Sequence, residues 1–185
     1  MRMIISGLGN LRAVVSLAAL VMAEAGCSLH PFASGTVESP SIRTDQQTYV
    51  FRHESGVSEI RIHATFENTA DRPVFVEKCG RAMPAFHLEK QAGEAWRRVY
   101  EPVCPRIVPV TVEVAPRSTY VDTVHVVSSQ EQGGYPRFEA DPISGTYRLV
   151  YQVRWAEGPA NQRRQGSLVP LGLRVSNTFQ LNEIR

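Results

Sequence analysis

Alternation of apolar and polar residues constrains this chain more than any other feature of its sequence. Residues 58–66 (SEIRIHATF) place Ile60, Ile62, Ala64 and Phe66 at every second position, with polar residues between them. Side chains of a β-strand point alternately to opposite faces, so this pattern predicts a strand buried on one face. No segment has the apolar period of an amphipathic helix over ten residues or more. We therefore expect the chain to fold from strands.

The same alternation recurs along the chain, separated by turn residues. Further strands are predicted at residues 73–78, 85–90, 95–100, 107–114, 119–126, 145–155 and 174–181. Gly93 marks the tip of a hairpin, and Pro109 favours an edge strand because proline cannot donate to a ladder. Residues 128–135 and 157–166 are polar and contain glycine, so we expect exposed loops there. Short strands at this spacing are typical of a sandwich or a barrel.

Composition and charge narrow the class of protein. The 185 residues are 43% hydrophobic and 21% charged, which is ordinary for a globular chain. This length suits one domain with short appendages. The 20 basic and 18 acidic residues leave a formal charge of +2, which excludes a nucleic-acid binder held by bulk charge.

The N-terminus is predicted to be an export signal. Arg2 and Arg12 supply positive charge, and residues 13–23 form an uncharged, mostly apolar run of 11 residues. A helix that spans a bilayer needs roughly 20 apolar residues. The run is therefore too short to cross a membrane and matches the apolar region of a cleavable signal peptide.

Two processing routes are open at the end of this signal. Residues 23–25 (AEA) fit ordinary cleavage before Gly26. Residues 25–27 (AGC) resemble a bacterial lipobox, in which Cys27 is acylated, although Glu24 stands where that pattern prefers leucine. Acylation of Cys27 would leave an even pair of cysteines, which favours the lipoprotein route in an oxidising compartment. We predict a signal peptide at residues 1–26.

The segment that follows is rich in serine, proline and glycine. Such a composition predicts a flexible linker, here residues 27–45, between the membrane and a folded domain of residues 46–185.

The remaining two cysteines, Cys79 and Cys104, are predicted to form a disulfide, as is usual in an exported protein. The alternative is a thiol site for redox chemistry or a metal, but the C-x-x-C spacing of redox sites is absent. His87, Met83 and His125 are a candidate copper set, because imidazole and thioether ligands suit copper. Their separation in sequence says nothing about closeness in space, and we predict no metal and no cofactor.

Asp141, Gly145 and Tyr147 form a D-x-x-x-G-x-Y pattern at the start of the predicted strand 145–155. The pattern resembles the tyrosine corner of immunoglobulin-like domains, in which the tyrosine bonds to upstream backbone. Leu149 stands where antibody domains have a cysteine, so only the architecture carries over. Alternation places Tyr147, Leu149, Tyr151 and Val153 on the buried face of this strand, and Arg148, Val150, Gln152 and Arg154 on the solvent face.

A wider resemblance covers most of the chain after the linker. Residues 64–79 (ATFENTADRPVFVEKC), a strand with Trp96, residues 143–151 (ISGTYRLVY) and residues 176–181 (SNTFQL) resemble small immunoglobulin-like domains of uncharacterised bacterial lipoproteins. The chain is also distantly similar to the intracellular proteinase inhibitor domain of Bacillus. The resemblance implies an all-β, immunoglobulin-like sandwich of about seven to nine antiparallel strands, without a catalytic residue.

No G-x-S-x-G, H-E-x-x-H or P-loop motif is present, so we expect no enzyme. The sequence predicts a non-catalytic envelope protein, periplasmic or lipid-anchored, that binds a partner or gives structural support in the envelope. Its expected partners are the membrane, through Cys27, and an envelope protein or glycan. A binding module would show an exposed aromatic patch, from Tyr135, Phe138 or Trp155. The alternatives are an inhibitor of an exported hydrolase that presents residues 128–138, and a periplasmic copper-binding protein.

Overall fold

The computed structural model describes residues 41–184 except 55–56, 82, 105–109 and 130–135. The predicted signal peptide, Gly26, Cys27 and most of the predicted linker therefore lie outside the described residues. The chain divides into two compact units, Met1–Gly35 and Thr36–Arg185, and the fold below is that of the second. Across the described ranges, no helix has both the length and the apolar character needed to span a bilayer.

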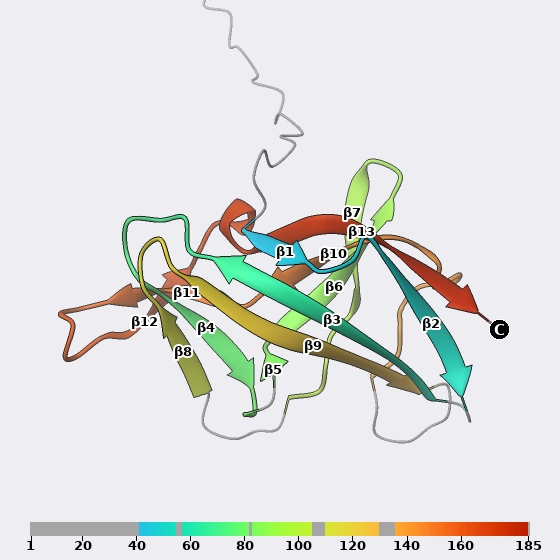
Figure 1. The fold of residues 1–185 in the computed structure, drawn as a ribbon, viewed down its shortest axis with the longest axis horizontal. Helices are drawn as coiled ribbons and strands as arrows, with labels where there is room; N and C mark the ends of the chain where they lie inside the picture. The colour runs from blue at the N-terminus through green and yellow to red at the C-terminus, as the bar shows by residue number, and fades with distance from the viewer. Residues whose placement is uncertain (1–40, 55–56, 82, 105–109, 130–135, 185) are drawn as a thin grey trace, which may run out of the picture. The chain divides into compact units, whose positions relative to one another are not determined.

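The described part of the chain is built from 13 strands and one short 3-10 helix, η1 (Figure 1). In chain order these elements are β1 (Ile42–Thr44), β2 (Thr48–Glu54), β3 (Val57–Glu67), β4 (Val74–Cys79), β5 (Met83–Pro84), β6 (Phe86–Ala92), β7 (Ala95–Tyr100), β8 (Val110–Val114), β9 (Thr119–Ser129), β10 (Gly145–Tyr151), β11 (Val153–Glu157), β12 (Arg164–Leu168), η1 (Leu171–Leu173) and β13 (Val175–Ile184). The predicted all-β fold is confirmed, in two sheets and with more strands than the predicted seven to nine.

The larger sheet has eight strands in the order β1-β3-β2-β13-β10-β6-β7, and β9 pairs with the full length of β3. Both β1 and β2 lie between β3 and β13, and each is antiparallel to β3 and parallel to β13. The predicted, purely antiparallel arrangement is therefore wrong at these two pairs. The register of β3 buries Ile60, Ile62, Ala64 and Phe66, as the alternation predicted.

The smaller sheet has the order β12-β11-β4-β5, with β8 on the other side of β4. The core that it shares with the larger sheet contains four of its valine side chains: Val74, Val76, Val114 and Val153. The predicted edge position of β8 agrees with its single partner strand, β4, among the described residues, whereas Pro109 lies outside them. The hairpin β6–β7 is also as predicted, with Gly93 at φ +63° in its turn.

A tyrosine joins the two ends of the larger sheet. The hydroxyl of Tyr100 on β7 donates to the carbonyl of Val127 on β9 at 2.9 Å and accepts from its N–H at 3.1 Å. In the strand order, β7 and β9 are at opposite ends of this sheet. The sheet must therefore curl around the core until its ends meet.

The single strand predicted at residues 145–155 is two strands. β10 ends at Tyr151 in the larger sheet, and β11 begins at Val153 in the smaller one, so the chain changes sheets at Gln152. The N–H of Gln152 donates to Ala85 and its carbonyl accepts from Glu77, both at 2.9 Å. Val150, expected in solvent, is fully buried and lies between two strand neighbours that are also buried, His87 on β6 and Val175 on β13.

Two predicted boundaries also change. Ser41 and Ile42 are 2% and 0% exposed and β1 belongs to the larger sheet, so the predicted linker boundary after residue 45 is too late. In the predicted loop 157–166, β11 extends to Glu157 and β12 begins at Arg164. Sequence patterning misses β12 because it is an exposed edge strand that pairs through its backbone and buries little.

Candidate functional site

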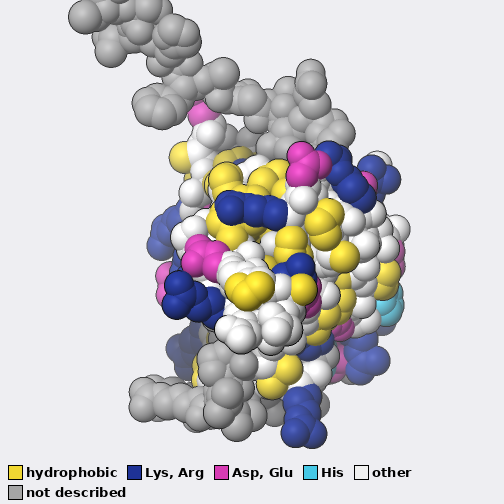
Figure 2. All heavy atoms as spheres, turned by 90° about the vertical axis from the view of Figure 1, so that its left-hand side faces the viewer, with side chains coloured by type: hydrophobic (Ala, Val, Ile, Leu, Met, Phe, Trp, Pro, Cys, Tyr) yellow, Lys and Arg dark blue, Asp and Glu magenta, His cyan; other side chains and the backbone are white. Residues whose placement is uncertain are grey.

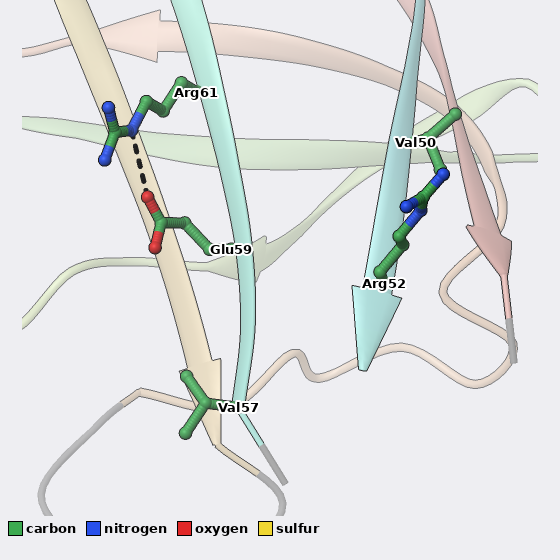
Figure 3. Close-up of a pocket in the computed structure, with 5 residues that line it drawn as sticks. All are labelled: Val50, Arg52, Val57, Glu59 and Arg61. Carbon is green, nitrogen blue, oxygen red and sulfur yellow. Dashed lines mark hydrogen bonds and ion pairs between the residues drawn. The ribbon is translucent and has the colours of Figure 1, made fainter. Parts of the chain in front are cut away.

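A groove lies on the outer face of the larger sheet, where β2 and β3 separate. The two strands pair only at Arg52–Glu59, His53–Ser58 and Glu54–Val57, and β3 next gains a neighbour on this side where Ala64 meets β1. Figure 1 shows β2 and β3 close together at their junction and apart beyond it. The groove has a volume of about 430 Å³ and is lined by Val50, Arg52, Val57, Glu59 and Arg61 (Figure 3).

Strand alternation explains which side chains reach this groove. On β2, Phe51 is fully buried in the core, whereas its neighbour Val50 is 45% exposed. On β3, the buried Ile60 separates Glu59 from Arg61, which both point outward. The walls therefore carry two exposed valines and three charged groups, drawn from two strands that the core holds in place.

The charges in the groove are unequally matched. Arg61 Nε lies 2.9 Å from Glu59 Oε1, and His125 Nε2 on the neighbouring β9 lies 2.6 Å from the same oxygen. The hydrogen bonds from Arg61 and then His125 lower the pKa of the Glu59 carboxyl from its ordinary value. Among the described residues, Arg52 makes no ion pair. Within the part of the chain that the structure describes, the groove thus offers one guanidinium without an acidic partner.

The backbone of β3 is also open on this side. The N–H of Asp45 donates to the carbonyl of His63, and the N–H of Glu67 donates to Ser41, so odd-numbered residues of β3 face β1 and β2. At the other end Glu59 is paired with Arg52. Arg61 lies between these points on the same edge, and no ladder pairing with β1 or β2 is present for it among the described residues.

The predicted aromatic patch is not formed by its described members. Phe138 packs inward, with its ring 5.1 Å from that of Phe51 and 5.0 Å from that of Tyr100. Trp155 is half-buried beneath the guanidinium of Arg72, which lies 3.7 Å from its ring. Figure 2, which views the side where β11 and β12 lie, shows hydrophobic side chains interrupted by basic ones. Tyr135 lies outside the described residues.

The candidate copper ligands have different partners in the fold. His87 on β6 contacts Glu89 Oε1 at 3.2 Å, whereas His125 on β9 contacts Glu59. Met83 packs against the core from β5 in the smaller sheet. Within the described residues, no group of three or more histidine, cysteine or acidic side chains could hold a metal ion.

The predicted disulfide is confirmed. Cys79 and Cys104 are bonded, with Cα atoms 5.0 Å apart, and the bond ties the end of β4 to the segment after β7. The candidate inhibitory loop, residues 128–138, is only partly described. Its first two residues belong to β9, which extends to Ser129, and residues 130–135 lie outside the described range.

The contact expected of a tyrosine corner is present. The hydroxyl of Tyr147 donates to the carbonyl of Ile143, and the ring is fully buried. Gly145 has φ +151°, a backbone conformation that favours glycine. Asp141 is exposed and precedes a cis peptide bond to Pro142.

The expectation that Arg148 points into solvent is wrong. Its side chain is only 16% exposed, its Nε and Nη2 lie 2.7 and 2.6 Å from Glu89 Oε2, and its guanidinium lies 4.4 Å from the ring of Trp96. These contacts form between neighbouring strands β10, β6 and β7. A sequence pattern gives the face on which a residue lies, but not the side chains that cover that face.

A second polar cluster, which the sequence did not predict, lies between the two sheets. Lys78 on β4 contacts Asp122 and, at 2.8 Å, the hydroxyl of Tyr120, both on β9. The Lys78 and Asp122 side chains are 10% and 16% exposed. Alternation along β4 places Lys78 on the same face as the buried Val74 and Val76. The sequence did not indicate its partners Asp122 and Tyr120, because these lie on β9.

Comparisons with known proteins identify no family for this chain. No protein-family model matches the chain, and no curated protein matches it. Among solved structures, it is similar to an alkylpurine DNA glycosylase, AlkC, of Pseudomonas fluorescens bound to DNA containing an abasic site analog, with 10% identity and a TM-score of 0.33. That match covers 78% of this chain but only 31% of the glycosylase.

A second solved structure is the CARDB domain of the PF1109 protein of Pyrococcus furiosus in complex with di-metal ions. It is 12% identical, has a TM-score of 0.28, and the match covers 78% of this chain and 86% of that one. Overlaps this loose carry no functional argument, so function must be argued from this chain's own residues.

Proposed function

We propose that this chain is a non-catalytic, exported envelope protein, anchored by a lipid on Cys27, that binds a partner through the groove between β2 and β3. The observation that carries the binding role is the groove itself. It combines a hollow of about 430 Å³, two exposed valines and an arginine that has no ion-pair partner among the described residues. Isolated exposed apolar residues are common on proteins, but a hollow that groups them with charge is typical of a recognition site.

Export is supported by the disulfide. Such bonds persist in oxidising compartments and are rare in the cytosol. With Cys79 and Cys104 joined, Cys27 is the one remaining cysteine among the three, and acylation would remove its reactive thiol from that compartment. A lipid on Cys27 would leave the residues between it and β1 as a spacer between the membrane and the folded unit.

The anchor is tested by fractionation of cells that express the full chain with its own signal. Wild-type protein is expected in the membrane fraction and to be extracted by detergent but not by high salt, because several acyl chains hold a protein stably on a bilayer. Cys27→Ala is expected in the soluble envelope fraction. Soluble wild-type protein that begins at Gly26 would contradict the anchor.

A further inference from the structure

We infer that the groove between β2 and β3 binds an extended, acidic peptide segment of a partner protein, which adds a short strand at Arg61. This inference rests on the proposed binding function and names the chemistry of the ligand. Three independent features of the groove point to it: an open stretch of strand edge, an unmatched cation and apolar walls.

The open edge gives the ligand its backbone conformation. Arg61 lies between His63, whose carbonyl is bonded to Asp45, and Glu59, which is paired with Arg52, and all three face the same side of β3. The N–H of His63 is also satisfied, by Asp45 Oδ1 at 3.1 Å. Only Arg61 of these three has no ladder partner on that side among the described residues. An extended peptide would supply one by adding a strand, which is a recurrent mode of peptide recognition.

The dimensions of the groove limit the length of this peptide. It is bounded on β3 by Val57 and Arg61, which are four residues apart. A strand rises about 3.3 Å per residue, so the groove accommodates about four residues of an extended chain. Alternate side chains of an added strand would lie on opposite faces of the sheet. The set on the outer face would lie beside Val50 and Val57, which are 45% and 36% exposed.

Charge gives the ligand its acidic character. Glu59 already accepts from Arg61 and contacts His125, whereas Arg52 stands opposite them on β2 without an acidic partner among the described residues. A carboxylate on the peptide, beside the valines, would pair with Arg52, and a guanidinium is well suited to hold it through two hydrogen bonds. A basic peptide would instead meet an unmatched like charge.

Fluorescein-labelled hexapeptides test this assignment on the full chain. One peptide alternates valine with glutamate, and its matched control alternates valine with lysine. The acidic peptide is expected to bind and the basic one not to bind, and added salt is expected to weaken the binding, because the pair at Arg52 is exposed. Equal binding of the two peptides, or binding of neither, would overturn the inference.

Paired variants locate the binding. Arg52→Ala is expected to weaken the acidic peptide about two- to fivefold, as for an exposed ion pair, and Arg52→Glu more than that. Arg164→Glu makes the same charge change at an exposed position of β12 in the other sheet and is expected to leave affinity unchanged. A similar loss in Arg164→Glu and Arg52→Glu would mean that net charge, and not the groove, attracts the peptide.

Amide hydrogen exchange distinguishes strand addition from simple charge attraction. The N–H of Arg61 is expected to exchange quickly in the free protein and to become protected when the acidic peptide binds. The N–H of His63, bonded to Asp45, serves as an internal control that is protected in both states. Peptide binding without protection at Arg61 would refute the added strand.

These outcomes are separable from those for the anchor. A chain that stays at the membrane through Cys27 but binds no acidic peptide would leave the envelope role intact and refute this ligand. A chain that binds the peptide through Arg52 but is soluble as wild type would refute the anchor alone.

Discussion

Glu89 is held between two cationic or hydrogen-bonding neighbours on the outer face of the larger sheet. Its carboxylate receives His87 on one oxygen and Arg148 on the other, and its side chain is 15% exposed. The hydrogen bond from His87 has the largest effect, and with Arg148 it outweighs the opposing effect of burial and lowers the pKa of Glu89 from 4.5 to about 2. Arg148, which the sequence pattern placed in solvent, is thus part of a network of polar contacts with Glu89.

The lowered pKa of Glu89 predicts a pH dependence of stability. A carboxyl whose pKa is lower in the folded state stabilises the fold above its unfolded pKa, and that contribution is lost as the pH falls from about 4.5 toward 2. Urea unfolding of wild type and Glu89→Gln at pH 7 and pH 3 measures it. Wild type is expected to lose more stability over this interval than the variant, and equal losses would contradict the role of Glu89.

At the scale of elements, the turn before β10 is fixed by the strand that follows it. Tyr147 is the first buried residue of β10, and its hydroxyl donates a hydrogen bond to the carbonyl of Ile143. Gly145 lets the backbone pass close to the side chain of Lys90. The Tyr147–Ile143 hydrogen bond spans only four residues. Because it is local, the D-x-x-x-G-x-Y spacing was enough to predict it.

Tyr147→Phe tests that contact, because it keeps the buried ring and removes only the hydroxyl. The variant is expected to lose about 0.5–1.5 kcal/mol of unfolding free energy, the net value of a hydrogen bond. Tyr147→Ala also removes a core aromatic and is expected to cost about 3–5 kcal/mol. Chemical denaturation measures both. An exposed β3 variant such as Arg61→Ala serves as a control with little expected effect, and a Tyr147→Phe change no larger than that control would argue against the corner.

At the scale of the whole folded unit, the two sheets are joined by more than the core. Lys78 on β4 pairs with Asp122 on β9, the chain crosses between the sheets at Gln152, and the disulfide ties the end of β4 to the segment that follows β7. The disulfide thus adds a covalent cross-link between the two sheets to the connections that the backbone makes.

Loss of the disulfide is expected to lower the melting temperature. The bond closes a loop with a sequence separation of 25, which in the chain-entropy account stabilises by about 3.5 kcal/mol and corresponds to about 10 °C in a domain of this size. Melting of the Cys79→Ser/Cys104→Ser variant is compared with wild type in the presence and absence of reductant. Reductant should shift wild type and leave the variant unchanged. Two alkylatable thiols in unreduced wild type would contradict the bond.

The sequence by itself determined the class of fold, the faces of β3, the hairpin at Gly93 and the corner at Tyr147. Each depends on neighbours within a few residues, where alternation and turn chemistry decide the conformation. It also indicated the disulfide, because an expected export signal and a lipid on Cys27 would leave Cys79 and Cys104 as a pair.

The tertiary structure alone decided the groove, the partners of Lys78, the burial of Val150 and Arg148, and the change of sheet at Gln152. All of these depend on which strands lie beside which, and strand order is set by contacts between distant residues. Val50 and Val57 illustrate the difference, since in sequence they are ordinary strand valines. Alternation places both on the outer face, but the hollow that groups them forms because β1 and β2 share one place in the sheet. Among the described residues this leaves Arg61 without a ladder partner on that side of β3.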